Sequence, residues 1–281
     1  MSGPATGQAA GSGVPPWDAA GPLGAEPIVF VHGTRLTRAS WRPQADRLAG
    51  EFRVILPDLP GHGTRAGERF TLEGAADAIG RVIDDGAAGR AIVVGLSLGG
   101  YVAMVLAART PERVRGLVLA GASQEPIGVW SIPYRALRLL FARAPRGPLD
   151  ALNRGFFRLR FPSEISEPII AGGFWPDGGA QALTELIGEH FAPRLASYPG
   201  PTLILNGSLD VLFRLGERHF LAAARDGHRR VVAGASHLVN LDRPDAVTDA
   251  IRAFARGPVV RAEASGRGIR PPPGILVEPT T

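Results

Sequence analysis

The sequence predicts an α/β fold, with a mostly parallel sheet of about six strands and helices on both faces. Two observations predict it. Short runs rich in valine, isoleucine and leucine alternate with longer amphipathic segments, and the short runs are apolar throughout, as is typical of strands covered on both faces. The expected strands are residues 28–31, 53–56, 91–95, 116–120, 202–206 and 230–233, and the expected helices are residues 41–49, 71–84, 99–109, 216–225 and 244–255.

The alternation of strands and helices stops between residues 123 and 199. This segment has no strand pattern, is interrupted by prolines and is rich in aromatic residues. Because it follows the fourth expected strand and precedes the fifth, we expect a helical cap at 123–199, inserted between two parts of an α/β core at 25–122 and 200–256. A few additional surface helices are the alternative.

The two ends of the chain have a different composition. Residues 1–24 and 257–281 are rich in glycine, alanine and proline and hold few large apolar side chains. Such segments cannot bury enough surface to offset the entropy lost on ordering. We therefore expect disordered tails at both ends.

The composition excludes several kinds of site. The chain has no cysteine, which excludes disulfides, thiolate metal sites and a cysteine nucleophile. Its net charge is +5, but the chain has arginine and no lysine, no block of five or six consecutive basic residues occurs, and no nucleic-acid-binding pattern is present. No apolar stretch reaches the roughly 18 residues that span a bilayer, and no basic segment opens the chain. We expect a cytoplasmic protein that binds neither nucleic acid nor membrane.

The sequence AIVVGLSLGG at residues 91–100 contains the most informative motif, Gly-x-Ser-x-Gly. It follows an apolar strand and opens a helix, which is the setting of a nucleophile elbow. A serine on such a sharp turn has a strained backbone, and its neighbours two residues away crowd the helix and the adjacent strands. Gly95 and Gly99 would supply the room. Ser97 is therefore the expected nucleophile, and an ordinary glycine turn after a buried strand is the alternative.

A serine hydroxyl needs a base, and the base needs a group that orients it. His237 lies on a loop after the last strand, and Asp210 lies four residues beyond the fifth, so both follow carboxyl ends of strands, where parallel sheets form their binding crevice. The chain order of serine, aspartate and histidine is the order that the elbow motif predicts. A solvated loop residue is the alternative for His237. Asp58, also at a strand end, is expected to hold its own turn through side-chain to main-chain bonds.

Stabilising the negative charge of the reaction intermediate requires two N–H groups. Leu98, directly after Ser97, offers one. Thr34, after the His-Gly turn that ends the first strand, offers the other. His32 and His62 follow the first two strands and could also line the site.

These features together resemble the α/β-hydrolase family. The matching stretches are IVFVHGT, VILPDLPGHG, IVVGLSLGG, VRGLVLAGA, PTLILNGSLD and GASHLVNLDRPDAV, which occur in family order across residues 25–256. The resemblance implies Ser97 as nucleophile, His237 as base, Asp210 as the orienting acid, and the main chain of Thr34 and Leu98 as oxyanion donors. Members of the family usually carry a β-hairpin before the His-Gly strand. No such hairpin is visible here, so we expect an exposed sheet edge, an edge covered by the N-terminal segment, or pairing with another chain.

Serine at position 97 also selects among the activities of this family. Relatives that open epoxides or cleave carbon–halogen bonds use aspartate there. We therefore predict a serine hydrolase that cleaves an ester, thioester or related acyl bond of a small-molecule substrate through an acyl-enzyme, with no metal and no cofactor. The alternatives are a non-hydrolytic enzyme (a lyase, an acyltransferase or a cofactor-free oxidase) and a ligand-binding protein with little turnover. The oligomeric state stays open.

The expected cap carries seven arginines between residues 135 and 160, beside one acidic residue, Asp150. Its composition favours a solvated helix face over a basic rim that steers an anionic substrate. Most cap aromatics are expected to pack within the cap.

Overall fold

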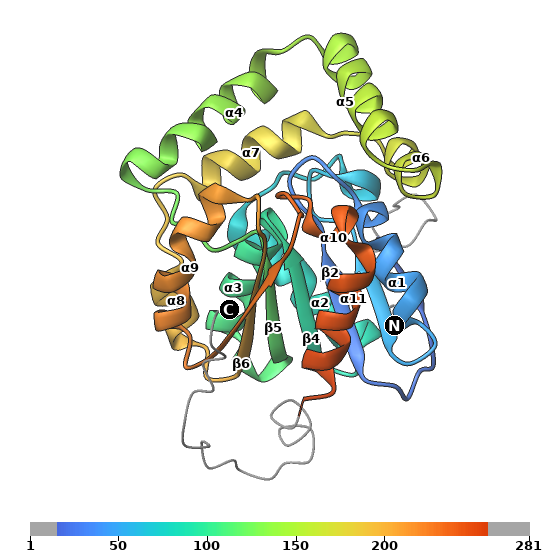
Figure 1. Ribbon diagram of the computed structural model, residues 1–281, viewed down its shortest axis with the longest axis vertical. Coiled ribbons are helices and arrows are strands. Elements are labelled where there is room, and N and C mark those ends of the chain that lie inside the picture. Colours follow the sequence, from blue (N-terminus) through green and yellow to red (C-terminus); the bar gives the residue numbers. More distant parts are fainter. Residues whose placement is uncertain (1–15, 258–281) are drawn as a thin grey trace, which may run out of the picture.

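Seven strands form the central sheet of the computed structural model, which describes residues 16–257 (Figure 1). The order across the sheet is β1-β3-β2-β4-β5-β6-β7. The strands are β1 (Trp17–Ala20), β2 (Pro27–Val31), β3 (Arg53–Pro57), β4 (Ala91–Leu96), β5 (Val114–Ala120), β6 (Pro201–Gly207) and β7 (Asp226–Val232). The α-helices are α1 (Arg42–Leu48), α2 (Leu72–Gly86), α3 (Leu98–Arg109), α4 (Ile132–Arg143), α5 (Arg146–Arg160), α6 (Ser163–Gly172), α7 (Pro176–Leu186), α8 (Ala192–Ser197), α9 (Val211–Ala223), α10 (Val239–Asp242) and α11 (Pro244–Ala255), with short 3₁₀ turns at Arg38–Trp41, Gly63–Arg65, Pro111–Arg113 and Gly128–Ser131.

The predicted α/β class with a mostly parallel sheet is confirmed. Strands β2 to β7 pair in parallel, and all residues of the central strand β4 and of β6 are buried. This burial on both faces is the physical reason for their uninterrupted apolar sequence. Parallel pairing also brings the carboxyl ends of these strands to one edge of the sheet.

The expectation of six strands and of a disordered segment at 1–24 was wrong for residues 17–20. These residues form β1, which pairs antiparallel with β3, from Trp17 opposite Pro57 to Ala20 opposite Val54. Backbone pairing to the edge of β3 and the packing of the Trp17 ring on the core offset the conformational entropy that this segment loses on ordering. The N-terminal segment thus covers the edge, one of the three outcomes expected. Residues 1–15 and 258–281 of the expected tails lie outside the described residues.

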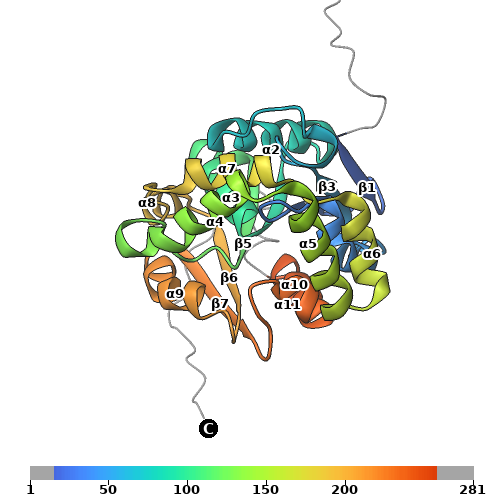
Figure 2. The same cartoon turned by 90° about the horizontal axis from the view of Figure 1, so that it is seen from above.

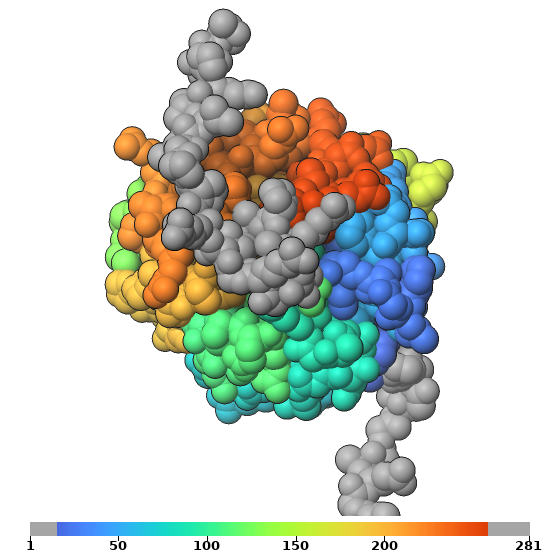
Figure 3. All heavy atoms as spheres, turned by 90° about the horizontal axis from the view of Figure 1, so that it is seen from below, coloured from blue at the N-terminus to red at the C-terminus, as the bar shows by residue number. Residues whose placement is uncertain are grey.

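Helices cover both faces of the sheet, as Figure 2 shows from above. On one face α2, α3, α8 and α9 share a continuous apolar cluster with the inner sides of the strands. On the other face a second cluster involves α1, α10 and α11. Seen from below, the red of α11 meets the blue of the segment around α1 (Figure 3), and Arg47 of α1 pairs with Asp245 of α11 at 2.6 Å. The first and last helices of the core therefore pack side by side although about 200 residues separate them.

The segment between β5 and β6 contains only helices. Helices α4, α5, α6 and α7 lie above the carboxyl ends of the strands, whereas α8 packs lower, against α3 and α9 (Figure 1). Apolar residues of α5, of the position directly after it and of α6 join the cluster on the α1 side: Phe157, Phe161, Ile169 and Ile170. Whether this segment behaves as a separate cap unit with the predicted boundaries stays a prediction.

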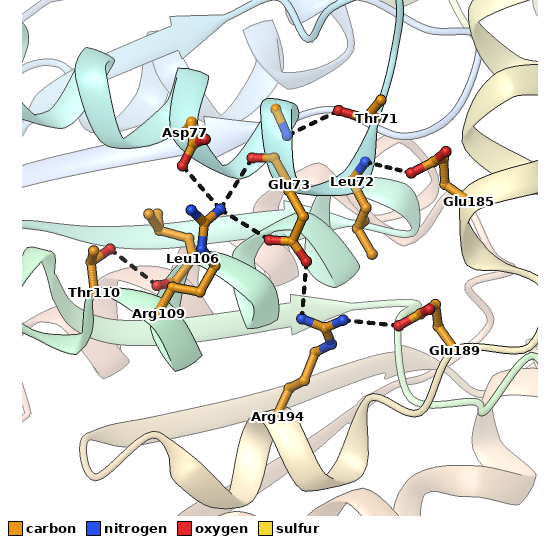
Figure 4. A network of polar contacts seen from close by, with 11 residues as sticks. Thr71, Leu72, Glu73, Asp77, Leu106, Arg109, Thr110, Glu185, Glu189 and Arg194 are labelled. Atoms are coloured by element: carbon orange, nitrogen blue, oxygen red, sulfur yellow. Dashed lines mark hydrogen bonds and ion pairs between the residues drawn. The ribbon is translucent and has the colours of Figure 1, made fainter.

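Polar contacts also tie this segment to the core (Figure 4). Glu73 of α2 accepts from Arg109 of α3 at 3.0 Å and from Arg194 of α8 at 3.3 Å, and Glu185 of α7 accepts from the main-chain N–H of Leu72 at 3.1 Å. The charged groups are substantially exposed, so each ion pair contributes at most about 1 kcal/mol. Their arrangement orients α7 and α8 on the core more than it stabilises the fold.

None of the helices within residues 16–257 is long and apolar enough to cross a lipid bilayer.

Candidate active site

Ser97 sits at the turn between β4 and α3, with φ 50° and ψ −113°. Such a conformation is uncommon for a residue with a side chain and stores about 1–3 kcal/mol of strain. The neighbouring glycines make the turn possible. A Cβ at Gly95 would overlap the main chain of Gly99, and a Cβ at Gly99 would overlap the carbonyl of Val31 on β2. The predicted reason for Gly95 and Gly99, close approach of helix and strands, is thus visible in the structure.

Three loops bring the predicted residues together. The Nε2 atom of His237 lies 3.0 Å from the Ser97 Oγ atom, and its Nδ1 atom lies 2.8 Å from Asp210 Oδ2. Asp210 is buried, whereas about a third of the His237 side chain, 37%, is exposed. The serine and the carboxylate thus contact opposite nitrogens of the same imidazole.

Sequence reasoning missed two neighbours of His237. The Phe213 ring stacks on the imidazole, with ring centroids 4.5 Å apart and an interplanar angle of 24°. Gly121, directly after β5, has φ +58°, and a Cβ there would lie 3.0 Å from both Cε1 and Nδ1 of His237. The only available signal was the small-residue run that follows the fourth predicted strand, which by itself does not indicate what it makes room for.

A buried hydrogen-bond network supports this arrangement from below. Asn206 of β6 accepts from the Gly121 N–H at 3.1 Å and donates to Ser123 Oγ at 2.8 Å and to Glu217 at 2.9 Å. The Ser123 hydroxyl in turn donates to the carbonyl of Phe213. Because every member is buried, the network fixes the loops after β5 and β6 relative to each other.

The two main-chain N–H groups predicted as oxyanion donors belong to different loops: Leu98 directly follows Ser97, and Thr34 follows β2. Leu98 opens α3, whose first N–H groups have no partner within the helix. Within residues 16–257, neither the Leu98 nor the Thr34 N–H donates to another group. The Thr34 Oγ1 atom is also buried without a hydrogen-bond partner there. These donors are therefore available to a ligand.

His32 and His62 do not join Ser97; they hold the loops around it. The Nε2 atom of His32 accepts from the Leu59 N–H at 3.0 Å, and that of His62 accepts from the Arg35 N–H at 3.1 Å, while each Nδ1 lies 2.9 Å from a main-chain carbonyl oxygen. This pattern requires neutral rings that carry their proton on Nδ1. Burial lowers the pKa of both imidazoles, that of His62 to about 3, with the neighbouring His32 ring as the second cause.

Asp58 plays the structural role predicted for it. Its carboxylate accepts from the Arg38 N–H at 2.9 Å and from the Thr64 N–H and hydroxyl at 3.0 Å each. Glu125, the other carboxylate near a strand end, accepts from two main-chain N–H groups at the start of α8. Neither carboxylate hydrogen-bonds to His237.

No group of three or more histidine, aspartate or glutamate side chains in the described part of the chain is arranged to hold a metal ion. The expectation of a metal-free and cofactor-free reaction stays a prediction.

Known proteins share this sequence pattern and this fold. A model described as the alpha/beta hydrolase family matches residues 28–250. The pimeloyl-[acyl-carrier protein] methyl ester esterase of Neisseria meningitidis is 30% identical over 270 residues, which cover 90% of this chain and 84% of the relative. The biotin biosynthesis bifunctional protein BioHC of Cellvibrio japonicus is 28% identical over 243 residues, which cover 81% of this chain but only 47% of the relative. A thermophilic esterase of Thermogutta terrifontis has a TM-score of 0.70 at 26% identity, over 85% of this chain and 92% of that structure.

Two of these relatives are named as esterases, and the prediction of a hydrolase is confirmed. The family model covers strands β3 to β7, nearly all of β2, the Ser97 turn and the loop that carries His237. The chain therefore belongs to the alpha/beta hydrolase family.

Proposed function

We propose that the protein hydrolyses an ester of a small-molecule acyl group, with Ser97 as nucleophile, His237 as general base and Asp210 as the orienting carboxylate. The observation that carries the proposal is the continuous pair of contacts through one imidazole, 3.0 Å to the serine and 2.8 Å to the carboxylate. A Ser-His-Asp arrangement converts a weak hydroxyl nucleophile into an effective one.

The geometry supports a two-step reaction. As Ser97 Oγ attacks the ester carbonyl carbon, its proton passes to His237 Nε2, and the carbonyl oxygen takes up negative charge near the N–H groups of Thr34 and Leu98. His237 then gives the proton to the leaving alcohol, and an acyl-enzyme remains. Water, deprotonated by His237, attacks the acyl carbon, and the acid leaves as Ser97 takes back its proton. Asp210 stabilises the imidazolium that forms in each step.

The stacked Phe213 ring supports the role of His237. Its face restricts rotation of the imidazole, and the buried Asp210 carboxylate fixes which nitrogen faces Ser97. A base held in one orientation loses less entropy in the transition state than a free one.

The test replaces the proposed nucleophile. Ser97→Ala is expected to lower kcat on 4-nitrophenyl butyrate by about 10⁴- to 10⁶-fold, because the serine acts as one unit with its base. Ser197→Ala, an exposed serine whose hydroxyl donates to the Arg194 carbonyl, is the matched control and should retain full turnover. A fluorophosphonate probe should label Ser97 in wild type and fail to label the folded His237→Ala variant. Unchanged turnover by Ser97→Ala would contradict the proposal.

A second candidate substrate is an acyl ester attached to an acyl-carrier protein, which the name of the Neisseria meningitidis relative gives for that enzyme. One surface favours it. On α4, Arg135, Arg138 and Arg143 have no carboxylate partner among the described residues, and Leu137 and Leu140 beside them are 43% and 48% exposed. Unpaired cations and exposed apolar groups on one helix suit an acidic protein surface.

The carrier hypothesis is tested with two matched substrates, a methyl ester of a carrier-bound acyl chain and the free acyl methyl ester. The double substitution Arg138→Glu and Arg143→Glu should lower kcat/KM for the carrier-bound ester by about 10-fold or more and leave the free ester unchanged. Arg158→Glu, on α5 and already paired with Glu167 at 2.8 Å, is the control. Equal rates on the two substrates in wild type would exclude the carrier.

A further inference from the structure

Arg35 follows the proposed oxyanion residue Thr34, and its side chain contacts helices α4 and α5 above the core. Its Nη1 atom donates to Asn153 Oδ1 of α5 at 3.1 Å, and its guanidinium carbon lies 4.3 Å from the ring centroid of Phe141 on α4. Its Nε atom is buried and has no acceptor. Within residues 16–257 no carboxylate pairs with this cation.

Two carboxylates that line one cavity with Asn153, those of Asp150 and Asp177, are already engaged. Asp150 pairs with Arg154 at 2.5 Å, and Asp177 pairs with Arg146. Neither offers its charge to Arg35. Loss of hydration is the single cause that lowers the pKa of Arg35 to about 10. A half-buried cation without an anion is unfavourable in the unliganded protein.

The backbone of Arg35 is also unfavourable. Its φ is 63°, in the left-handed region where glycine is the ordinary residue. Two main-chain contacts hold it there, from its N–H to His62 Nε2 at 3.1 Å and from the Trp175 N–H to its carbonyl at 3.0 Å. On α7, Gly179 leaves room for its stem, since a Cβ there would lie 2.5 Å from Arg35 Cγ. Backbone strain and an unpaired charge thus coincide at one residue, and this combination is characteristic of ligand sites.

We propose that Arg35 binds a carboxylate on the far end of the substrate's acyl chain, so that the preferred substrate is an ester carrying a second, anionic group. This inference rests on the proposed ester hydrolysis at Ser97. Arg35 directly follows Thr34, the proposed oxyanion donor, so the two residues share one loop and their Cα atoms lie about 3.8 Å apart. In this proposal, the acyl chain of an ester held at Thr34 runs toward the guanidinium of Arg35.

A carboxylate suits the donors that Arg35 leaves free. Asn153 uses only one Nη1 donor, and the planar guanidinium offers further N–H groups in a fixed fork that matches two carboxylate oxygens. Binding would give the cation the counter-charge that the described part of the chain does not supply. A neutral acyl chain would leave the cation unpaired. The enzyme therefore discriminates in two ways, because the anionic substrate gains an ion pair and the neutral one keeps a half-buried cation unpaired.

The test uses 4-nitrophenyl monoesters of dicarboxylic acids of increasing length, each beside its twin with the second carboxyl capped as a methyl ester. Wild type should prefer the free acid over its twin at one length at least. Arg35→Gln should lower kcat/KM for that free acid by about 10- to 100-fold and change the capped twin by less than about 3-fold. Arg158→Gln removes an exposed charge of the same sign and should change neither. Equal losses on both substrates, or no preference at any length, would overturn the inference.

Binding measurements separate this inference from the proposed reaction. Calorimetry with the preferred diacid should show binding to Ser97→Ala and about 10-fold or weaker binding to Ser97→Ala combined with Arg35→Gln. Arg35→Lys, in the same Ser97→Ala background, keeps the charge and loses the planar fork, so its affinity for the diacid should lie between those of the other two variants. This variant keeps the inference testable where the glutamine variant does not fold. Arg35-dependent binding without Ser97-dependent hydrolysis would support the site and refute the reaction. Hydrolysis with binding that ignores Arg35, or Arg35-dependent binding of inorganic phosphate but not of the diacid, would refute the carboxylate site.

Discussion

His62 makes the stability of the protein depend on pH in a calculable way. Its buried ring has a pKa of about 3, because burial and the neighbouring His32 ring disfavour the charged form. In the unfolded chain the imidazole has its ordinary pKa of about 6.5. Between these values the unfolded chain binds a proton that the folded protein does not, so stability falls as pH drops through 6.5 and stops falling near 3.

The magnitude follows from linkage. Between about pH 7.5 and about pH 5 the folded ring stays neutral while the unfolded one becomes almost fully protonated, which removes about 2 kcal/mol from the free energy of unfolding. His32, whose pKa is lowered by burial as well, acts in the same direction. Carboxylates also titrate in this window, so the effect of His62 must be isolated as a difference between two proteins.

Urea denaturation of wild type and His62→Asn at both pH values isolates it. Asparagine can still donate to the Pro60 carbonyl that accepts from Nδ1, and it cannot take up a proton. The variant should be less stable at pH 7.5, because the Arg35 N–H loses its acceptor, but should lose about 2 kcal/mol less than wild type on acidification. His190→Asn is the matched control, because the His190 side chain is exposed in the folded protein, and it should lose as much as wild type. Equal losses in wild type and His62→Asn would refute the reasoning.

Two further predictions concern the site and the sheet edge. Gly121→Ala should lower kcat by about 10- to 100-fold with a smaller change in KM, because its Cβ would lie 3.0 Å from the His237 ring. Gly50→Ala, with open space around it, is the control and should leave kcat unchanged. Steady-state kinetics of both variants check this, and equal activities would contradict it. Asp18→Pro should remove an N–H that bonds to β3 in the alternating antiparallel ladder, expose that edge and give concentration-dependent association in sedimentation velocity. Ala19→Pro, whose N–H points away from β3, and Asp18→Ala, which removes only the carboxylate, should sediment like wild type; association of all three would disprove the ladder argument.

Much of the fold could be predicted because the signals are local. Strands β2 to β6 lie where apolar runs of four or five residues predicted them, and α11 has the predicted bounds. The last strand was placed late: β7 begins at Asp226 rather than at residue 230, because its first residues are polar and partly exposed on an edge. Burial on both faces produces a readable pattern, and an edge strand lacks it.

The surroundings of His237 could be predicted from the sequence only in part. Ser97, Asp210 and His237 were selected from their positions after strands, and the structure brings them within hydrogen-bond distance. Phe213 and Gly121 carry no residue chemistry that marks them, and their importance comes only from which ring they touch.

By itself, the sequence determined the order of strands β2 to β7, the serine turn and the residue types at the strand ends, because periodicity and turn chemistry are properties of short segments. Only the tertiary structure decided that residues 17–20 become a strand, that His32 and His62 are neutral supports, and that Arg35 has no anionic partner among residues 16–257. Each of these depends on burial and on contacts between segments far apart in the chain, and such contacts leave no periodic signal in the residues that make them.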